Sequence, residues 1–499
     1  MWETRIGNLR LAVQHRSQDG DGGATLRVLD ANGDERLRFD CFERVPHYHL
    51  DPAGRDEISA LDPRQDTIAW TLGELRGDLR GYLERTDAPD PDFDDGDAAV
   101  ALDAAEAALR NPPLDLDSID LADLQARISE KWSTYDDDVL AAWVAEMDFP
   151  IAEPIRRVLQ GAVSIGDIGY PLAPSETGLP EVFADRMAGR FGWEPDPANV
   201  EILQCVVQGL HVALDAYSER GSGVVVQTPI YPPFLSVVSE TGRRLVDNRL
   251  LPGPERFEID FDRLAKDADP DTRVLLFCNP HNPTGRVFDR AELQRIAELA
   301  CARDWVVVSD EIHADLVYES REFIPFASLG PEIAARTVTL TSATKAFNIP
   351  GLRCGVAHFG SADLKNRFNA AHPRNARGGV GLLGLYASQA AWQHSQPWLD
   401  TVRSYLDENR RFLADRLAKD FTGIRFQLPE ATYLAWLDCR ELGLGPAPSD
   451  VFLERGRVAL NDGRHFGAGL EGHARLNFAT SKDILGQILD RMKNAIETA

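Results

Sequence analysis

The chain has 499 residues, of which 43% are hydrophobic and 26% charged, so it can build two or three globular domains. Its formal net charge of −26 argues against nucleic acid or an anionic membrane surface as a main partner. The six cysteines form no CxxC pair, and the sequence shows neither a signal-peptide pattern nor an apolar run of bilayer-spanning length. These features predict reduced thiols, a cytoplasmic location and no membrane span.

Residues 1–86 are predicted to form a small, β-rich α+β accessory domain. Apolar and polar residues alternate at Leu26–Val28 and at Leu37–Phe39, on either side of Asn32-Gly33. Both turn residues tolerate a positive φ, so we expect a β-hairpin closed by a type I′ turn. His47-Tyr48-His49 with Asp51 is interpreted as ordinary strand structure, so no metal site is predicted.

Residues 87–120 are interpreted as an acidic linker followed by a helix. A first helix is expected before them, from about Thr71 to Arg85, and the helix after the linker should run from Ala98 to Arg110 and end at Asn111-Pro112-Pro113. The first 120 residues hold 27 acidic and 13 basic side chains. We interpret that excess as a solvated surface.

Apolar runs alternate with amphipathic helices after residue 121. Runs that are apolar on both faces are typical of a parallel sheet covered by helices, so this region is predicted to be α/β. We expect an N-terminal segment of a small domain at 121–165, a large domain at 166–395 and a smaller α+β domain at 396–499. The four clearest strands are Val224–Val226, Val274–Phe277, Trp305–Val308 and Thr337–Leu340.

Polar and aromatic residues follow each of these four strands, where ligands bind in a parallel sheet. They supply a ring, an amide, a carboxylate with an imidazole, and an amine, which is the set that pyridoxal 5′-phosphate (PLP) requires. The segments are Thr228-Pro229-Ile230-Tyr231, Asn279–Gly285, Ser309-Asp310-Glu311-Ile312-His313 and Thr341-Ser342-Ala343-Thr344-Lys345.

Longer motifs extend this pattern over roughly 360 residues. Residues 131–492 resemble the class I/II aminotransferase family of PLP enzymes, and most closely its cystathionine β-lyase-type C–S lyases. The resemblance implies the fold type I architecture, with a mostly parallel seven-stranded sheet in the large domain. It is carried by KWSTY (131–135), WVAEMDFP (143–150), CNPHNPTGRVF (278–288), SDEIHADLVY (309–318), SATKAFNIPGL (342–352), LNDGRHFG (460–467) and RLNFA (475–479).

The resemblance implies a role for each matching residue. Lys345 would hold PLP as a Schiff base and act as the base at the substrate Cα. Asp310 would pair with the ring nitrogen and Asn282 with the phenolic oxygen. His313 would also bond that oxygen or, alternatively, be a packed core histidine. Tyr231 would stack on the ring.

The phosphate and the substrate need further residues. The start of a helix at Val206 and Val207 would offer backbone N–H groups to the phosphate. Ser342 and Arg353 match family phosphate ligands. Tyr170 matches a tyrosine that reaches the phosphate from the other subunit, which predicts a homodimer with shared sites. The substrate would be bound by Arg475, through its α-carboxylate, and by Trp143, Ala145, Asn348 and Tyr433.

Two reactions remain open. C–S β-elimination from an L-cysteine conjugate is favoured by the motifs, while transamination of an amino acid or related amine is the alternative. Glu146, Arg353 and Cys205 depart from the lyase pattern and leave the reaction in question. A PLP-binding transcriptional regulator is disfavoured, because the N-terminal region is acidic and has no helix-turn-helix pattern.

Overall fold

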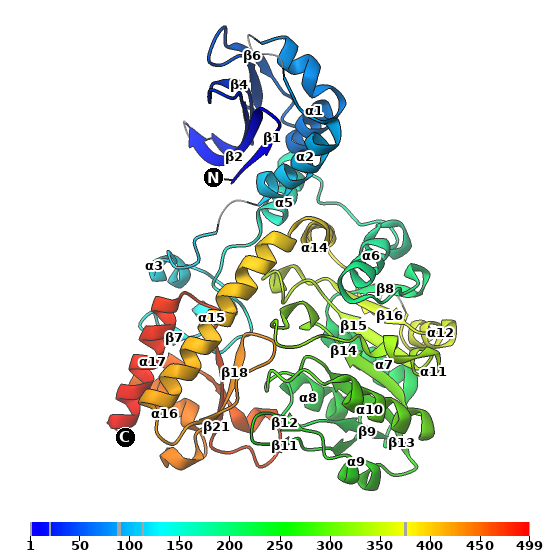
Figure 1. Cartoon of the computed structure of the whole chain (residues 1–499). Helices are drawn as coiled ribbons and strands as arrows, with labels where there is room; N and C mark the ends of the chain where they lie inside the picture. Colours follow the sequence, from blue (N-terminus) through cyan, green and yellow to red (C-terminus); the bar gives the residue numbers. More distant parts are fainter. Residues whose placement is uncertain (1, 19–20, 87–90, 112–113, 374–376, 499) are drawn as a thin grey trace. The chain divides into compact units, whose positions relative to one another are not determined.

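The computed structural model describes residues 2–18, 21–86, 91–111, 114–373 and 377–498. The chain divides into two compact units, each considered separately below (Figure 1). The first comprises Met1–Asp115, Ala152–Asp167 and His394–Trp398, and the second comprises Leu116–Ile151, Ile168–Gln393 and Leu399–Ala499. Residues 87–90 of the predicted linker and Pro112-Pro113, at the predicted helix end, lie outside the described residues.

The first unit contains a six-stranded antiparallel sheet in which each strand pairs with the next along the chain. Every second side chain faces the hydrophobic core, as the alternation in the sequence predicts. The strands are β1 (Trp2–Ile6), β2 (Leu9–Gln18), β3 (Asp21–Leu29), β4 (Glu35–Phe42), β5 (His47–Leu50) and β6 (Glu57–Ala60).

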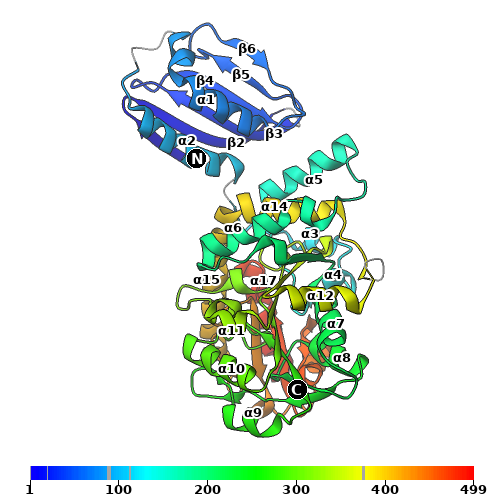
Figure 2. The same cartoon turned by 90° about the vertical axis from the view of Figure 1, so that its right-hand side faces the viewer.

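Two helices cover one face of this sheet (Figure 2). Helix α1 (Thr67–Glu84) begins at Asp66, whose carboxylate accepts the N–H groups of Ile68 and Ala69. Helix α2 (Asp95–Arg110), which the sequence analysis grouped with the linker, also packs its apolar side on the sheet. The hydrophobic core of the unit therefore extends to Leu109.

The predicted hairpin between β3 and β4 is confirmed, but its turn differs from the expected one. The backbone has a positive φ at Gly33 (90°) and not at Asn32, so the turn is not of type I′. The Asp30 carboxylate accepts the N–H groups of Asn32 (2.8 Å) and Asp34 (3.1 Å). These bonds close a longer Asx-type turn, which removes the need for a second residue with positive φ.

The second unit is built on a seven-stranded sheet of order β10-β9-β13-β14-β15-β16-β8. Only β16 runs antiparallel to its neighbours, which confirms the predicted mostly parallel sheet. The strands are β8 (Val200–Leu203), β9 (Gly223–Val226), β10 (Arg244–Asp247), β13 (Thr272–Cys278), β14 (Val306–Asp310), β15 (Thr337–Thr341) and β16 (Gly355–Phe359).

Helices cover both faces of this sheet. On β13, Val274 and Leu276 pack toward α7, α8 and α12, while Leu275 and Phe277 pack toward α9 and α10. This explains why the central strands are apolar on both faces. The helices of this region are α6 (Leu179–Phe191), α7 (Val206–Tyr217), α8 (Pro232–Glu240), α9 (Phe261–Asp267), α10 (Arg290–Ala302), α11 (Pro331–Ala334), α12 (Ala362–Ala371) and α14 (Leu382–His394).

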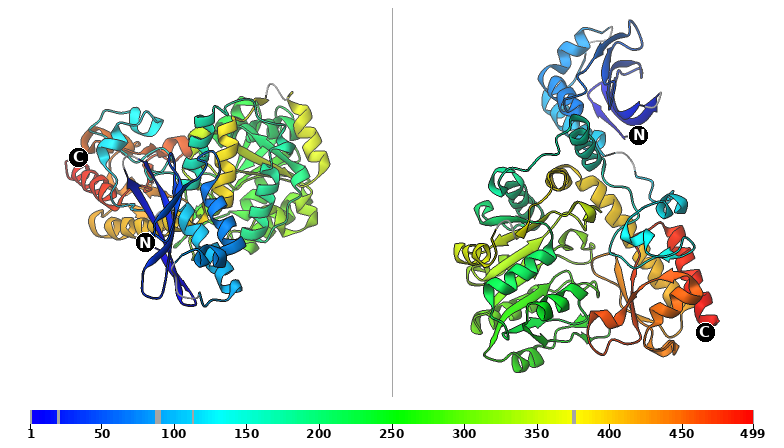
Figure 3. Two further views of the ribbon diagram at one scale, coloured as in Figure 1. Left: turned by 90° about the horizontal axis from the view of Figure 1, so that it is seen from above. Right: turned by 180° about the vertical axis from the view of Figure 1, so that it is seen from behind.

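A smaller α+β region completes the second unit, with a four-stranded sheet of order β17-β18-β21-β20. Helices α16 and α17 pack against each other beside this sheet (Figure 3). Its elements are β17 (Arg425–Phe426), β18 (Leu434–Asp438), β20 (Asn461–Asp462), β21 (His473–Asn477), α16 (Pro448–Gly456) and α17 (Lys482–Glu497).

The described residues form further helices and short strands outside these groups. No helix of the described residues combines the length and apolarity that crossing a bilayer requires. The elements are α3 (Leu121–Gln125), α4 (Glu130–Ser133), β7 (Leu140–Ala141), α5 (Glu153–Ile165), β11 (Leu251–Pro252), β12 (Phe257–Glu258), α15 (Gln396–Asp420) and β19 (Val458–Ala459).

Candidate active site

The carboxyl edge of the seven-stranded sheet gathers the chemistry-bearing side chains of the second unit. Asp310 is the last residue of β14, and Lys345 follows β15 by four positions. Tyr231 follows β9 as the N-cap residue of α8, and Asn282 follows β13. Because β9, β13, β14 and β15 are parallel neighbours in register, all four side chains belong to one edge.

The Lys345 amine is buried in the protein. Its Nζ donates a hydrogen bond to the backbone oxygen of Ala145 at 2.8 Å. Burial, followed by the positive charge of Arg475, lowers the pKa of this amine to about 8. The amine therefore loses its proton far more easily than an exposed lysine, and about a tenth of it is unprotonated at pH 7, as a nucleophile or base requires.

The Asp310 carboxyl group is buried near that amine. Its Oδ1 accepts the N–H of Ile312 at 3.1 Å. Burial raises its pKa to about 7, although the Ile312 N–H and the Lys345 charge act in the opposite direction. A carboxylate so poorly solvated is stabilised by a cation placed against it, such as a protonated pyridine nitrogen.

Two aromatic side chains line the same space. The His313 ring meets the Tyr433 ring edge-on, with centroids 6.2 Å apart. Burial lowers the pKa of His313 to about 3, so its imidazole is neutral. Its Nδ1 is buried and has no hydrogen-bond partner among the described residues. The Tyr433 hydroxyl donates to the Ala145 oxygen at 3.0 Å.

Arg475 reaches the site from β21. Its Nη1 donates to Oδ1 of Asn282 at 3.0 Å, and its Nη2 donates to the Trp143 oxygen at 2.9 Å. It also bonds Asn461 and lies 5.1 Å from the centre of the Phe466 ring. Burial lowers its pKa to about 10, which still leaves the guanidinium charged at neutral pH.

The sequence analysis did not assign roles to Asn461 and Phe466. Both lie in the segment LNDGRHFG (460–467), which it used only as a family motif. Their contacts with Arg475 fix the direction of the guanidinium. The signal was therefore present in the sequence, but the pairing depends on β20 lying beside β21.

The loop at residues 143–149 presents the Ala145 oxygen to Lys345. It has no strand partner of its own, and buried polar side chains hold it instead. The Asn477 amide donates to the oxygens of Val144 (2.6 Å) and Glu146 (2.7 Å). The Lys131 amine donates to the Glu146 oxygen at 3.1 Å and pairs with the Asp148 carboxylate at 2.8 Å.

Asn348 also belongs to this support rather than to an open substrate surface. Its Oδ1 accepts the Met147 N–H at 2.9 Å, and its Nδ2 donates to the oxygens of Met147 (3.0 Å) and Phe149 (2.9 Å). The amide is thus fully used by the loop backbone. These bonds position the loop, and the substrate contact of Asn348 stays a prediction.

The predicted phosphate position is the start of α7. Cys205 is the N-cap residue and makes no side-chain cap, so the first-turn N–H groups of Val206 and Val207 point out of the helix. A Cβ added to Gly355 would lie 3.2 to 3.4 Å from backbone atoms of Cys205 and Val206. The start of β16 therefore closely approaches this helix end.

The other three predicted phosphate ligands differ in burial: Ser342 is buried, whereas Arg353 and Tyr170 are exposed. The Ser342 hydroxyl is buried and donates to the Cys354 oxygen at 2.6 Å, next to Gly355. Arg353 is exposed and has a left-handed backbone, with φ 47°. Tyr170 is fully exposed beside a pocket of about 950 Å³ lined by residues 168–171, 351–352 and 378–384. The Lys345 amine bonds the Ala145 oxygen and none of these three residues.

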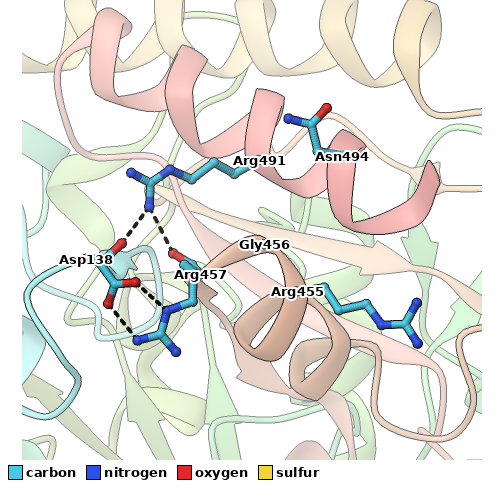
Figure 4. A pocket seen from close by; sticks show the side chains of 6 residues that line it. All are labelled: Asp138, Arg455, Gly456, Arg457, Arg491 and Asn494. Carbon is cyan, nitrogen blue, oxygen red and sulfur yellow. Dashed lines mark hydrogen bonds and ion pairs between the residues drawn. The ribbon is translucent and has the colours of Figure 1, made fainter. Parts of the chain in front are cut away.

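A smaller pocket of about 260 Å³ shares no lining residue with this site (Figure 4). Its arginines are engaged: Arg457 pairs with Asp138 at 2.6 Å, and Arg491 donates to the Asp138 oxygen, also at 2.6 Å. These contacts attach the chain before β7 to α16 and α17. We therefore interpret this pocket as structural.

The residues at the sheet edge fit PLP. They supply a buried amine, a buried carboxylate in need of a cation, an unpartnered imidazole nitrogen and an uncapped helix start. No side chain of this set requires a metal ion. The arrangement therefore defines a site for a cofactor that combines an aldehyde, a pyridine nitrogen and a phosphate.

Comparison with known proteins agrees with this class of site. Residues 176–492 match the family model for aminotransferase class I and II, and residues 4–103 match that of a domain of unknown function (DUF7700). The chain therefore belongs to the class I and II aminotransferase family. This confirms the predicted family, its fold and its cofactor, PLP.

Several relatives are similar over nearly their whole length. Cystathionine beta-lyase PatB of Bacillus subtilis (strain 168) is 35% identical over 361 residues, which cover 72% of this chain and 93% of that protein. The cystathionine beta-lyase of Corynebacterium glutamicum is 35% identical over 378 residues, covering 76% and 99%. The crystal structure of a PLP-bound C–S lyase from Staphylococcus hominis has a TM-score of 0.71 at 28% identity, covering 77% and 99%.

Proposed function

We propose that this chain is a PLP-dependent carbon–sulfur β-lyase acting on L-cystathionine or another S-conjugate of L-cysteine. Two findings support the proposal: the similarity to cystathionine beta-lyases and a C–S lyase, and the residues at the sheet edge. The observation that carries it is the buried Lys345 amine, whose pKa of about 8 suits proton removal near neutral pH.

Different residues of the chain would bind PLP, orient its ring and remove the substrate proton. PLP, when bound, supplies an aldehyde that joins primary amines and a ring that takes up the electrons released at the substrate Cα. Lys345 would hold it covalently and then remove the Cα proton. Asp310 would keep the ring nitrogen protonated, and Tyr231 would cover one face of the ring. Val206 and Val207 would bind the phosphate through their N–H groups.

Substrate binding would rest mainly on Arg475. Its charged, rigidly held guanidinium can bind the α-carboxylate through two hydrogen bonds, although it now donates to Asn282 and Asn461. Trp143 and Tyr433 would line the side of the pocket toward the sulfur-bearing chain. The neutral His313 imidazole would share with Asn282 the bond to the phenolic oxygen of PLP.

The overall reaction consumes water and requires no second amino-group acceptor. After Lys345 removes the Cα proton, the Cβ–S bond breaks and its electron pair leaves on sulfur as a thiolate, which takes up a proton. The remaining 2-aminoacrylate adds water and gives pyruvate and ammonium. Each turnover therefore yields one thiol, one pyruvate and one ammonium ion.

A substrate assay tests this function against transamination. Purified protein should release pyruvate from L-cystathionine, measured by coupled NADH oxidation with lactate dehydrogenase, without added keto acid. Lys345→Arg is a matched control, because it keeps the positive charge but cannot act as a base near neutral pH. Amino transfer seen only with a keto acid present would make the chain an aminotransferase and contradict the lyase proposal.

We further propose that the enzyme is a cytoplasmic homodimer with shared active sites. The fully exposed Tyr170 beside a large pocket supports a role in a partner's site. All six cysteines are free, which suits a reducing compartment. The N-terminal residues 1–86, extended by α2, are proposed to serve oligomerisation or contact with a partner.

A further inference from the structure

The uncovered face of the N-terminal sheet brings together three metal-ligating side chains. Asp40 on β4 lies directly opposite His47 on β5, and His49 is two positions further along the same face. One ligand atom from each lies within 4.8 Å of the others. The sequence analysis considered Asp51 beside the histidines, but the structure pairs Asp51 with Arg36 and places Asp40 there instead.

Both histidines direct Nε2 at the same carboxylate oxygen of Asp40. The His47 Nδ1 lies 2.8 Å from the Val45 carbonyl oxygen, and the His49 Nδ1 lies 2.6 Å from Oδ1 of Asp56. These oxygens only accept, so each Nδ1 donates a hydrogen, and Nε2 is the ring nitrogen left for a metal ion. The two Nε2 atoms face Oδ2 of Asp40, at 3.4 Å from His47 and 3.6 Å from His49.

Those distances match the edges of a tetrahedral metal site. Bonds of 2.0–2.1 Å to zinc place neighbouring ligand atoms about 3.3 Å apart. The bonds from each Nδ1 to a carbonyl or carboxylate are the outer-shell contacts that orient metal-ligating histidines. The Asp40 carboxylate is also held: Nη2 of Arg16 donates to both of its oxygens at 2.7 Å, and the Thr25 hydroxyl donates to Oδ1 at 2.6 Å.

A cationic side chain now lies among these acceptors. The Arg38 guanidinium donates to Nε2 of His49 at 2.7 Å and to Oδ2 of Asp40 at 3.1 Å. The Asp40 carboxylate and the two Nε2 atoms converge on one point, where a positive charge is favourable. The Arg38 guanidinium supplies such a charge beside Asp40 and His49. Its side chain is 22% exposed and also pairs with Glu35, so it can withdraw toward Glu35 and solvent.

We propose that Asp40, His47 and His49 bind a divalent transition-metal ion, for which Zn²⁺ is the test ion, and that the ion displaces the Arg38 guanidinium. The ligand set of two imidazoles and one carboxylate favours such an ion over Mg²⁺ or Ca²⁺, which prefer oxygen ligands. The ion would tie β4 to β5 and hold the Asp56 segment against them.

Calorimetric titration of the full-length, untagged holoenzyme with ZnCl₂ after chelator treatment tests the proposal. We expect one Zn²⁺ per chain, which His47→Ala and His49→Ala abolish. Asp56→Asn should weaken binding by about 10- to 100-fold. Arg38→Ala should tighten it, which distinguishes a displaced cation from a required one.

A control variant removes a comparable histidine elsewhere. His372 pairs with Asp215 at 2.8 Å in the other unit, so His372→Ala should leave the stoichiometry unchanged. Circular dichroism and the PLP absorption band would show that each variant is folded and loaded. Zn²⁺ binding that survives both His47→Ala and His49→Ala, or no binding by the folded wild type, would overturn the proposal.

Discussion

Single residues owe their chemistry to their surroundings more than to their type. Lys345 is one of seven lysines in the chain, and its place after an apolar strand marks it in the sequence. The lowering of its pKa depends on burial and on Arg475, which is 130 positions away in the chain and approaches only in the folded protein. The position of the amine was therefore predictable from sequence, but its degree of activation was not.

The neighbouring Glu311 gives a pH-dependent prediction. It accepts hydrogen bonds from Ser309 and Phe326, and burial raises its pKa to about 8. The folded state thus binds this proton more tightly than the unfolded state. The resulting stabilisation is fully present below about pH 4.5 and is lost as the pH rises through about 8.

Glu311→Gln mimics the protonated acid at every pH. Relative to the wild type, we expect this variant to gain stability between pH 5 and pH 9, by a few kcal/mol at about 1.4 kcal/mol per pKa unit. Thermal unfolding at pH 5, 7 and 9 measures the difference. Glu298→Gln, at an exposed position on α10, is the control. Parallel pH profiles for wild type and Glu311→Gln would refute this assignment.

At the scale of elements, the loop at 143–149 depends on side chains from distant parts of the chain. Lys131 and Asp148 form an ion pair in which each side chain is 1% exposed. Breaking such a pair by removing one partner costs about 3–5 kcal/mol, because a buried charge is left alone. The same amine also supports the Glu146 oxygen and so the loop that faces Lys345.

Lys131→Met should lower both the melting temperature and the rate of pyruvate release. The double variant Lys131→Met/Asp148→Asn removes the unpaired charge and keeps an acceptor for the Trp132 indole N–H. We expect it to recover most of the melting temperature while its KM stays above that of the wild type, since the Glu146 oxygen keeps the Asn477 amide but still lacks the Lys131 amine as its second donor. Full recovery of KM in the double variant would show that Lys131 serves stability alone.

Helix α7 offers a backbone test of phosphate binding. Val206 is the first helical residue, where proline is tolerated but has no N–H. Cys205 before it has an extended backbone (φ −163°, ψ 165°), which a following proline permits. Val206→Pro should weaken PLP binding about tenfold, the value of one charge-assisted hydrogen bond.

Equilibrium dialysis of PLP against the cofactor-free variants measures this loss. Val206→Ala keeps the N–H but removes similar packing, and so separates the two effects. Equal PLP affinities for Val206→Pro and Val206→Ala would mean that this N–H does not face the phosphate.

The accuracy of sequence-based prediction differed between elements for physical reasons. Buried parallel strands such as β13 and β14 are apolar on both faces and were predicted to within two residues. The type of the turn at Asn32-Gly33 was not predicted correctly, because it depends on hydrogen bonds to Asp30. The bonds from Asn348 to the loop backbone were not foreseen either, because they join distant parts of the chain. The spacing of apolar residues along the sequence predicts which strands and helices are buried. Hydrogen bonds between polar side chains and distant backbone groups depend on the tertiary structure, so this spacing does not predict them.

At the scale of the whole molecule, the proposed dimer makes a prediction about mixed subunits. If Tyr170 serves the partner's site, Tyr170→Ala and Lys345→Ala each impair sites in a pure dimer. A mixed dimer would contain one site with both changes and one site with neither. Co-refolding the two variants should therefore restore pyruvate release to about a quarter of the wild-type rate, counting random pairing of subunits.

The activity of the mixture must be compared with the sum of the residual activities of the two variants. Each variant refolded alone gives the baseline, and sedimentation velocity shows whether dimers form. No recovery above the sum of the two baselines, with dimers present, would place Tyr170 outside the partner's site.

The account rests on the covalent attachment of PLP to one lysine, and borohydride reduction tests that attachment directly. Reduction of the holoenzyme fixes the bond between the cofactor and its lysine, and peptide mass spectrometry after proteolysis locates it. We predict the added mass on the peptide that contains Lys345, with loss of the visible absorption band. The same mass on another of the seven lysines, or on none of them, would contradict the account.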